Sequence, residues 1–301
     1  MTNTFFQAAS KVLKKTFTNS AVDVPVLWDG IFNTYEPDMK RPFMTFLPII
    51  PLTTWGVKPE GGSPLYDQAS EGTAYTMNYT TYALAYKITE EMELEDVQGL
   101  IKLLPKQLMR SGRITQELLF WNLLNLGFTA GVNGADGQNL FSTGHTVTGA
   151  ANVSNSGGTV ALTPEALQQA IIAFQTLVDD RGIASSRTPM TLVVPPQLAK
   201  IAEEVVGSAK YPYSNENRPN VVAGSVTPLV SRWITSTTAW YLLAGKGDLE
   251  GDTHSLGTSF KWRDRQATWR DEATGNISHR ASFRCAYGFV NWRGSWGSQG
   301  S

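Results

Sequence analysis

The sequence predicts an α+β fold in which long strands pack against one long helix, with a smaller unit of helices and strands. Two alternating segments, Tyr75–Ile88 and Arg280–Phe289, are typical of strands. Between them, Pro105–Leu126 is typical of a single helix, and residues 163–206 give the order helix, strand, helix. At 301 residues the chain is long enough to bury a large core.

The composition favours a protein with little surface exposed to water. Charged residues make up 17% of the chain and hydrophobic residues 42%, whereas globular domains carry about 25% charged residues. Two interpretations fit: a stable extracellular β protein, and a subunit that is covered in an oligomer. The single cysteine, Cys285, allows no internal disulfide and fits a reducing compartment. No apolar run reaches the roughly 18 residues of a membrane helix, and we expect no secretory signal.

Charge is unevenly distributed although the net charge is only −1. Residues 60–96 hold eight acids and one base, a local −7, and residues 260–293 hold seven bases and three acids, a local +4. Two explanations stay open: balance within one chain, or attraction between neighbouring copies, since charge complementarity guides register more than it adds affinity. A near-neutral chain lacks the basic signature of a nucleic-acid-binding protein.

The first 52 residues are expected to form a helix followed by an extended segment. Residues 4–17 carry an apolar stripe at helical spacing, and most lysines lie off it. Such a helix docks on its own domain or on a neighbour, and less commonly on a membrane surface. Residues 21–52 are rich in proline and are expected to cross the molecule in an extended form.

Residues 53–92 are expected to project as a hairpin. The pattern predicts a short strand at Thr53–Val57, a tip at Gly61–Pro64 and the long return strand. The return strand changes face by one residue at Thr80–Thr81. Because a large apolar projection needs a partner surface, we expect this strand to lie over a neighbouring subunit and to add little to its own core. Deleting Gly56–Thr73 should then leave a folded subunit.

The rest of the chain is expected to form a central helix, a helix–strand–helix unit and closing strands. The central helix, opened by Pro105, spans 22 residues, or about 33 Å at 1.5 Å per residue. Residues 129–160 are expected to be a long loop with a short hairpin. Thr163 and Pro164 open the next helix, before the strand Met190–Val194 and the helix Gln197–Val206. The expected closing elements are Val226–Ile234, Trp240–Leu243, Ser259–Trp262, Ala267–Arg270 and the last alternating strand, with a frayed tail from Ser295.

The residues that could carry chemistry favour structural roles. The three histidines lie in no metal-binding spacing, and the Gly-rich segments match no phosphate-binding motif. Ser142, His145 and a distant acid stay a weak hydrolase alternative, since the GxSxG elbow is absent. Asp179–Gly182 is typical of a turn rather than of a cation site. The tryptophans between residues 262 and 292 alternate with arginines, which favours packing in a sheet over base stacking. We expect no catalytic residue, no metal, no cofactor and no enzymatic activity.

The order of these segments resembles the major capsid proteins of tailed phages with the Hong Kong 97 fold, in particular the Mu-like prophage major head subunit family. The segments that carry the resemblance are YTMNYTTYALAYKITEEMELED (Tyr75–Asp96), LLPKQLMRSGR (Leu103–Arg113), NLFSTGH (Asn139–His145), LTPEALQQAIIAFQTLVDDRG and TLVVPPQLAKIAEEVV (within Leu162–Val206), and RASFRCAYGFVNWRG (Arg280–Gly294). Together they span nearly the whole chain, although no single one is diagnostic.

The resemblance implies five regions. These are an N-terminal helix and extended arm (1–52), an extended β-hairpin loop (53–92), a peripheral domain with a spine helix (93–160), an α/β axial domain (161–258) and peripheral-domain closing strands (259–301). It also implies a structural virion protein, the major capsid subunit, which assembles as hexamers and pentamers into an icosahedral shell around double-stranded DNA.

The resemblance further implies partners and a location. The partners would be further copies of the chain, scaffolding, portal and decoration proteins, and packaged DNA held by non-specific contact, with no membrane. The location would be the virion capsid, and the bacterial host cytoplasm during assembly. Because a long charged N-terminal scaffold region is absent, scaffolding is expected to be a separate protein or to have been removed.

Two other functions stay open: an encapsulin-like compartment shell, and an intracellular hydrolase or binding module. Under the capsid interpretation, we expect the acidic hairpin of one subunit to meet the basic closing strands of the next. The expected interface comprises Tyr75, Met77, Tyr79 and Tyr82 on the return strand, Glu90, Glu91, Glu93 and Glu95 on the acidic turn, and Arg263, Arg265, Arg280 and Arg284 on the closing strands.

Overall fold

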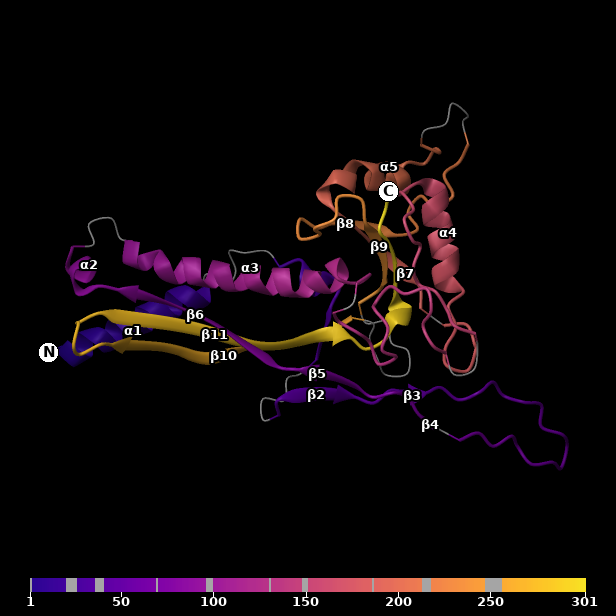
Figure 1. Cartoon of the computed structure of the whole chain (residues 1–301), viewed down its shortest axis with the longest axis horizontal. Helices are drawn as coiled ribbons and strands as arrows, with labels where there is room; N and C mark the ends of the chain where they lie inside the picture. Colours follow the sequence, from indigo (N-terminus) through magenta and orange to yellow (C-terminus); the bar gives the residue numbers. More distant parts are fainter. Residues whose placement is uncertain are drawn as a thin grey trace.

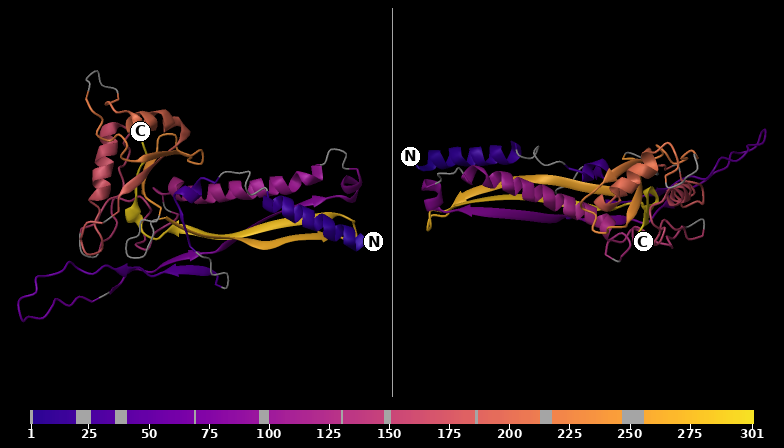
Figure 2. Two further views of the ribbon diagram at one scale, coloured as in Figure 1. Left: turned by 180° about the vertical axis from the view of Figure 1, so that it is seen from behind. Right: turned by 90° about the horizontal axis from the view of Figure 1, so that it is seen from above.

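The computed structural model describes most of the chain. The described residues are 2–19, 26–35, 41–68, 70–95, 100–129, 131–147, 151–185, 187–212, 218–246 and 256–301, with side chains except at 2–10, 100 and 256–266. They form an elongated body of long strands and one long helix, a second body at one end, and a hairpin that projects below both (Figure 1). Seen from above, the molecule is long and narrow (Figure 2).

A four-stranded sheet in the order β1-β10-β11-β6 forms the elongated body. Its strands are β1 (Asn33–Tyr35), β6 (Thr80–Ile88), β10 (Leu256–Arg270) and β11 (Ile277–Phe289). β1 is parallel to β10, and the other pairs are antiparallel. The two strands predicted at 259–262 and 267–270 are one strand, because a bulge between Arg263 and Ala267 shifts the register without ending the pairing.

The predicted central helix is confirmed as α3 (Leu104–Asn125), which runs along the sheet (Figure 1). Its C-terminal half is buried through Phe120, Trp121, Leu123 and Leu124, as its almost wholly apolar sequence predicts. The N-terminal helix is α1 (Thr2–Asn19), and it contacts α3. Phe17 at its end packs among residues of α3 and β11 in one apolar cluster, so this helix docks on its own subunit.

The return strand of the hairpin belongs largely to the body, which corrects the sequence prediction. β6 pairs with β11 over its whole length, from Thr80↔Cys285 to Ile88↔Ile277. Only β5 (Tyr75–Asn78) leaves this sheet, to pair with β2 (Phe43–Phe46). The predicted change of face at Thr80–Thr81 lies where the strand exchanges one partner for the other. Without β6, the backbone groups of β11 on that edge would have no hydrogen-bond partners, and its apolar side chains would be uncovered. The pairing with β11 therefore holds β6 on the body.

The second body is a sheet in the order β12-β9-β7-β8 with two helices. α4 (Pro164–Gln175) begins as predicted, since Thr163 Oγ1 accepts a hydrogen bond from the Ala166 N–H at 3.1 Å. β7 (Pro189–Val194) and α5 (Ala199–Gly207) complete the predicted helix–strand–helix unit. β8 (Thr227–Val230) is parallel to β7, and β9 (Trp240–Ala244) is antiparallel to it.

The C-terminal tail is part of this sheet, so the expectation of a frayed end was wrong. β12 (Ser295–Ser298) pairs with β9, and all four of its residues are buried. Trp296 lies against Trp240, with ring centroids 4.9 Å apart. The glycines and serines around Trp296 give the segment low strand propensity, but the ladder and one buried indole outweigh it.

Candidate assembly interface

The projecting hairpin is shorter than the sequence predicts, and it ends in a lobe formed by residues 51–68. The strands β3 (Ile49–Ile50) and β4 (Ser70–Glu71) form its neck, with Ile49 opposite Glu71 and Ile50 opposite Ser70. No residue of the lobe is in regular secondary structure, so the strand predicted at Thr53–Val57 is absent. The predicted tip is confirmed, since the Gly62 N–H donates to the Pro59 carbonyl at 3.0 Å. The lobe extends past the second body (Figure 1).

The lobe exposes large apolar side chains. Trp55 is 97% exposed and Val57 is 99% exposed, and Leu52, Leu65 and Tyr66 are also mostly in solvent. Leu52, Trp55, Leu65 and Tyr66, together with neighbouring residues, line a concavity of about 530 Å³. A contiguous apolar surface on a soluble subunit marks a contact site for another protein.

The aromatic side chains of the return strand pack inside the subunit. Met77 is buried beside Ala286 and Val290, and Tyr75 stacks on Phe289 with ring centroids 6.2 Å apart. Tyr82 stacks on Phe283, at 5.3 Å. The expectation that this strand adds little to its own core was therefore wrong, because β11 presents apolar rings that these side chains cover.

The acidic turn is the short helix α2 (Glu90–Leu94), which is docked on the turn between β10 and β11. Thr89 caps it by accepting a hydrogen bond from the Met92 N–H at 3.2 Å. Glu93 pairs with Arg270 of the same chain, with 2.6 Å between carboxylate and guanidinium. Glu93 is therefore paired within its own chain. Glu90, Glu91 and Glu95 are exposed on this turn, and the carboxylate of Glu90 lies beside Gly275 in the turn between β10 and β11.

Of the predicted arginines, one has contacts within its own chain and another is exposed. Arg284 lies over the ring of Tyr79, 5.1 Å from its centroid, and donates to the Arg41 carbonyl at 3.3 Å. Arg280 is exposed on β11. The side chains of Arg263 and Arg265 lie outside the described residues. Glu91, Glu95 and Arg280 are therefore the charges that remain best placed to meet a neighbour.

The histidine raised as a weak catalytic alternative has a structural role. His145 is fully buried and bonds Asp136 through Nδ1 at 2.6 Å and Asn155 through Nε2 at 3.1 Å. Both ring nitrogens are thus taken, and Ser142 Oγ lies instead near Gln138 Oε1, at 3.4 Å. Burial works against ionisation of Asp136, but its bond to His145 holds the pKa of this carboxyl below its ordinary value. No Ser–His relay forms here.

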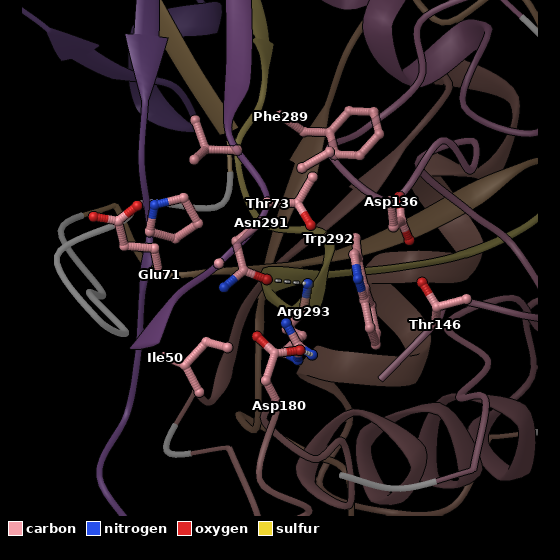
Figure 3. A pocket seen from close by; sticks show the side chains of 14 residues that line it. Ile50, Glu71, Thr73, Asp136, Thr146, Asp180, Phe289, Asn291, Trp292 and Arg293 are labelled. Atoms are coloured by element: carbon pink, nitrogen blue, oxygen red, sulfur yellow. Dashed lines mark hydrogen bonds and ion pairs between the residues drawn. The ribbon is translucent and has the colours of Figure 1, made fainter. Parts of the chain in front are cut away.

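The pocket beside this histidine lies between the base of the hairpin and the segment after β11. It has a volume of about 280 Å³, and Figure 3 shows Asp136, Asp180, Trp292 and Arg293 around it. Asp180 and Arg293 form an ion pair at 2.8 Å, so these charges neutralise each other.

Among the described residues, no group of three or more His, Cys, Asp or Glu side chains is placed to hold a metal ion. No helix in the described part of the chain is both long and apolar enough to cross a membrane.

Sequence reasoning missed the apolar side chains of the lobe. The signal was present: Trp55, Val57, Leu65 and Tyr66 stand in a polar stretch rich in glycine and proline, with too few apolar neighbours to form a core face. Large apolar residues with no internal partner are candidates for an external one.

A family model described as phage capsid protein matches residues 76–296, well over half of the chain. No curated protein matches the sequence.

Solved structures share the fold. The capsid of bacteriophage JBD30 is 15% identical with a TM-score of 0.58, covering 70% of this chain and 92% of that one. The mature capsid of bacteriophage PhiM1 is 11% identical with a TM-score of 0.59, covering 92% and 88%. A virus-like particle from Pyrococcus furiosus is 9% identical with a TM-score of 0.51, covering 96% and 98%. The predicted α+β fold of the Hong Kong 97 type is confirmed by these likenesses.

Proposed function

Because this chain belongs to the phage capsid protein family, we propose that it is the major capsid subunit of a phage head and assembles as hexamers and pentamers into an icosahedral shell around double-stranded DNA. The observation that carries the assembly step is the lobe, whose Trp55 and Val57 are almost fully exposed on a projection outside the core. A second copy of the chain is the partner that a repeating shell supplies to every lobe.

Electron microscopy of the purified protein, with its nucleic-acid content measured, tests this function. Closed shells of uniform diameter are expected. Particles that enclose protein cargo instead of nucleic acid would support the encapsulin-like alternative, which the phage capsid family match does not favour. A protein that stays monomeric at high concentration, alone and with a scaffolding protein, would contradict the proposal. The family and the fold are those of a structural protein, which agrees with the expectation of no enzymatic activity.

The exposed charges support a role in setting the register between subunits. α2 lies at the end of the elongated body that is farther from the second body (Figure 1). Glu91 and Glu95 are exposed on this turn, and Arg280 is exposed on β11. An exposed ion pair contributes only about 0–1 kcal/mol, but the same bias is repeated at every contact around a ring. The acidic turn of one copy would therefore favour the correct register on the next copy.

Reversing two of these charges is expected to slow or misdirect assembly while leaving the subunit intact. We expect Glu91→Lys with Glu95→Lys to lower the yield of closed shells several-fold, with a melting temperature within about 2 °C of the parent, since exposed substitutions change stability little. Glu93 is left unchanged because its pair with Arg270 lies within the chain. Light scattering and microscopy measure the yield.

The matched control carries the same change of charge elsewhere. Glu165→Lys with Glu203→Lys alters two exposed acids on α4 and α5. Adding Arg280→Glu to the first variant should restore part of the yield. Equal yields from the two double variants would show that total charge matters and that the position of the acids does not.

The partners that remain proposals are scaffolding, portal and decoration proteins, with assembly in the bacterial host cytoplasm. The JBD30 capsid is decorated with minor capsid protein trimers. We extend this to a similar decoration of the present shell, and we keep packaged DNA as a partner held by non-specific contact.

The free subunit is expected to bind duplex DNA weakly and without sequence preference. A net charge of −1 offers few phosphate contacts, and binding through phosphates falls steeply as salt rises. Fluorescence anisotropy should detect binding at low salt that is largely lost at about 150 mM salt. Nanomolar, sequence-selective binding at that salt would contradict this prediction.

A further inference from the structure

The turn Asp179–Gly182 follows α4 by a few residues, and several hydrogen bonds and an ion pair hold it in place. Asp179 is buried, and its Oδ1 accepts hydrogen bonds from the N–H groups of Arg181 at 2.8 Å and Ile183 at 2.9 Å. Gly182 has a φ of 78°, a left-handed conformation that glycine adopts without strain. Asp180 pairs with the buried guanidinium of Arg293, which also donates to the Val178 carbonyl at 2.7 Å. The backbone of Arg181 is therefore fixed on the second body.

The side chain of Arg181 reaches from this turn to the hairpin and contacts both of its limbs. Its Nε donates to the Pro51 carbonyl on the outgoing limb at 3.2 Å. Its Nη2 lies 3.3 Å from the Gln68 carbonyl on the returning limb and 3.4 Å from the carboxylate of Asp67. A planar guanidinium can hold such a set of acceptors at once because its donors are fixed in a fork.

Asp67 closes the base of the lobe from the other side. Its Oδ2 accepts a hydrogen bond from the Thr53 N–H at 2.8 Å, and its Oδ1 accepts one from the Gln68 N–H at 2.9 Å. The Thr53 bond, together with the Gln68 bond and the charge of Arg181, lowers the pKa of Asp67 against the opposing effect of burial. The carboxylate is thus charged at neutral pH, and it links the two limbs to each other and to Arg181.

We propose that Arg181 and Asp67 form a latch that sets the direction in which the lobe leaves the subunit before any neighbour binds. The neck has only two residues per strand, and one backbone bond, from the Gly72 N–H to the Pro48 carbonyl, continues it toward the β2–β5 pair. A ribbon of two strands is too weak to hold a projection in one direction by itself. The latch joins this neck to a turn that is itself anchored in the second body. This inference rests on the proposed function, because a lobe of fixed direction matters for docking on a neighbour.

The direction of the lobe in the free subunit can be measured with spin labels. Ser63→Cys at the tip and Gln168→Cys on α4 place one label on each side of the latch. Burial raises the pKa of the native Cys285 thiol to about 12, so this thiol does not compete for the label at neutral pH. We expect one narrow distance distribution by pulsed electron paramagnetic resonance.

The same measurement on latch variants decides the proposal. We expect Arg181→Ala and Asp67→Asn to broaden the distribution at least twofold. Arg181→Lys should broaden it nearly as much, because an ammonium keeps the charge but cannot reproduce the fork. The control Lys200→Ala removes a cation that is 85% exposed on α5 and should leave the distribution unchanged. A distribution that stays narrow in Arg181→Ala, with the melting temperature also unchanged, would overturn the latch.

Assembly gives a second result that separates the latch from the proposed function. Arg181→Ala should give shells of mixed diameter or open sheets, whereas the parent and Lys200→Ala should give uniform shells. If the parent forms no shells under any condition, the proposed function fails, and the label distances still judge the latch. If Arg181→Ala frees the lobe and yet builds shells as uniform as those of the parent, the latch does not set the geometry of docking, and its proposed role is wrong.

Discussion

A subunit whose lobe is replaced by a short linker is expected to fold and stay soluble but to form no shells. The replacement exchanges residues 54–66 for Gly-Ser-Gly. The Thr53 N–H and Asp67 Oδ2 lie only 2.8 Å apart, so a short linker joins the two limbs without strain. The removed side chains include Trp55 and Val57, which are almost fully exposed and add little to the core. We expect circular dichroism and the melting temperature to match the parent, and microscopy to find no particles.

The position of this replacement matters. Deleting Gly56–Thr73, as the sequence pattern suggests, would also remove β4 and the latch carboxylate, and would confuse loss of the lobe with loss of its anchor. Trp55→Ser with Val57→Ser is the matched variant, because it keeps the chain length and removes only apolar surface. It should lower the yield of shells at least tenfold. Normal particles from the linker variant would show that the lobe is not an assembly contact.

The elements with a local signal were predicted closely. Thr163 and Pro164 mark the start of α4 through a capping hydroxyl and a residue suited to the first turn. α3 was placed to within one residue at each end, because Pro105 and a long apolar run determine a helix without reference to the rest of the fold. Both signals depend on neighbours in sequence.

The errors concern partners that are distant in sequence. Alternation identified Thr80–Ile88 as a strand but could not show that its partner is β11, about two hundred residues later in the chain, rather than a neighbouring subunit. The tail was misjudged for the same reason, since β12 is stabilised by β9 and by one contact between Trp296 and Trp240. Pairing energies of this kind belong to the fold and not to the segment.

In the candidate interface, too, local features were predicted and contacts between distant residues were not. Clusters of like charge are visible in the sequence, and the acidic turn was located correctly. The sequence does not show which of its acids form ion pairs within the chain, because Glu93 and its partner Arg270 are 177 positions apart. Arg181 and Asp67 are 114 positions apart, and each alone is an ordinary surface charge. Only the fold brings them to one neck.

The side chain of Asn155 connects the loop before α4 to the start of β12. It is fully buried in the loop before α4. Its Oδ1 accepts hydrogen bonds from the Ser142 N–H at 2.9 Å and from His145 at 3.1 Å. Its Nδ2 donates to the carbonyls of Leu140 at 2.7 Å and Ser295 at 3.1 Å. One amide thus links the loop after α3 to the start of β12.

Substituting Asn155 by alanine is expected to be among the most destabilising single changes in the chain. The substitution leaves buried donors and acceptors of the loop and of the Ser295 segment without partners, and each such group costs about 1–3 kcal/mol. The total is several kcal/mol, a large share of the roughly 5–15 kcal/mol that stabilises a folded protein. We expect a melting temperature lower by on the order of 10 °C, or an insoluble product.

The asymmetry of the amide makes the prediction specific. Asn155→Asp keeps an oxygen for the Ser142 N–H but faces the Leu140 and Ser295 carbonyls with a second acceptor, so it should destabilise about as much as alanine. Asn152→Ala, at an exposed position in the same loop, should melt within about 2 °C of the parent, because no buried group depends on it. Loss of shells in the Asn155 variants would accompany loss of the fold, whereas the lobe variants lose shells and keep the fold. If Asn155→Ala has the melting temperature of the parent, the apolar contacts alone hold this loop against β12, and the hydrogen bonds of Asn155 do not stabilise the subunit.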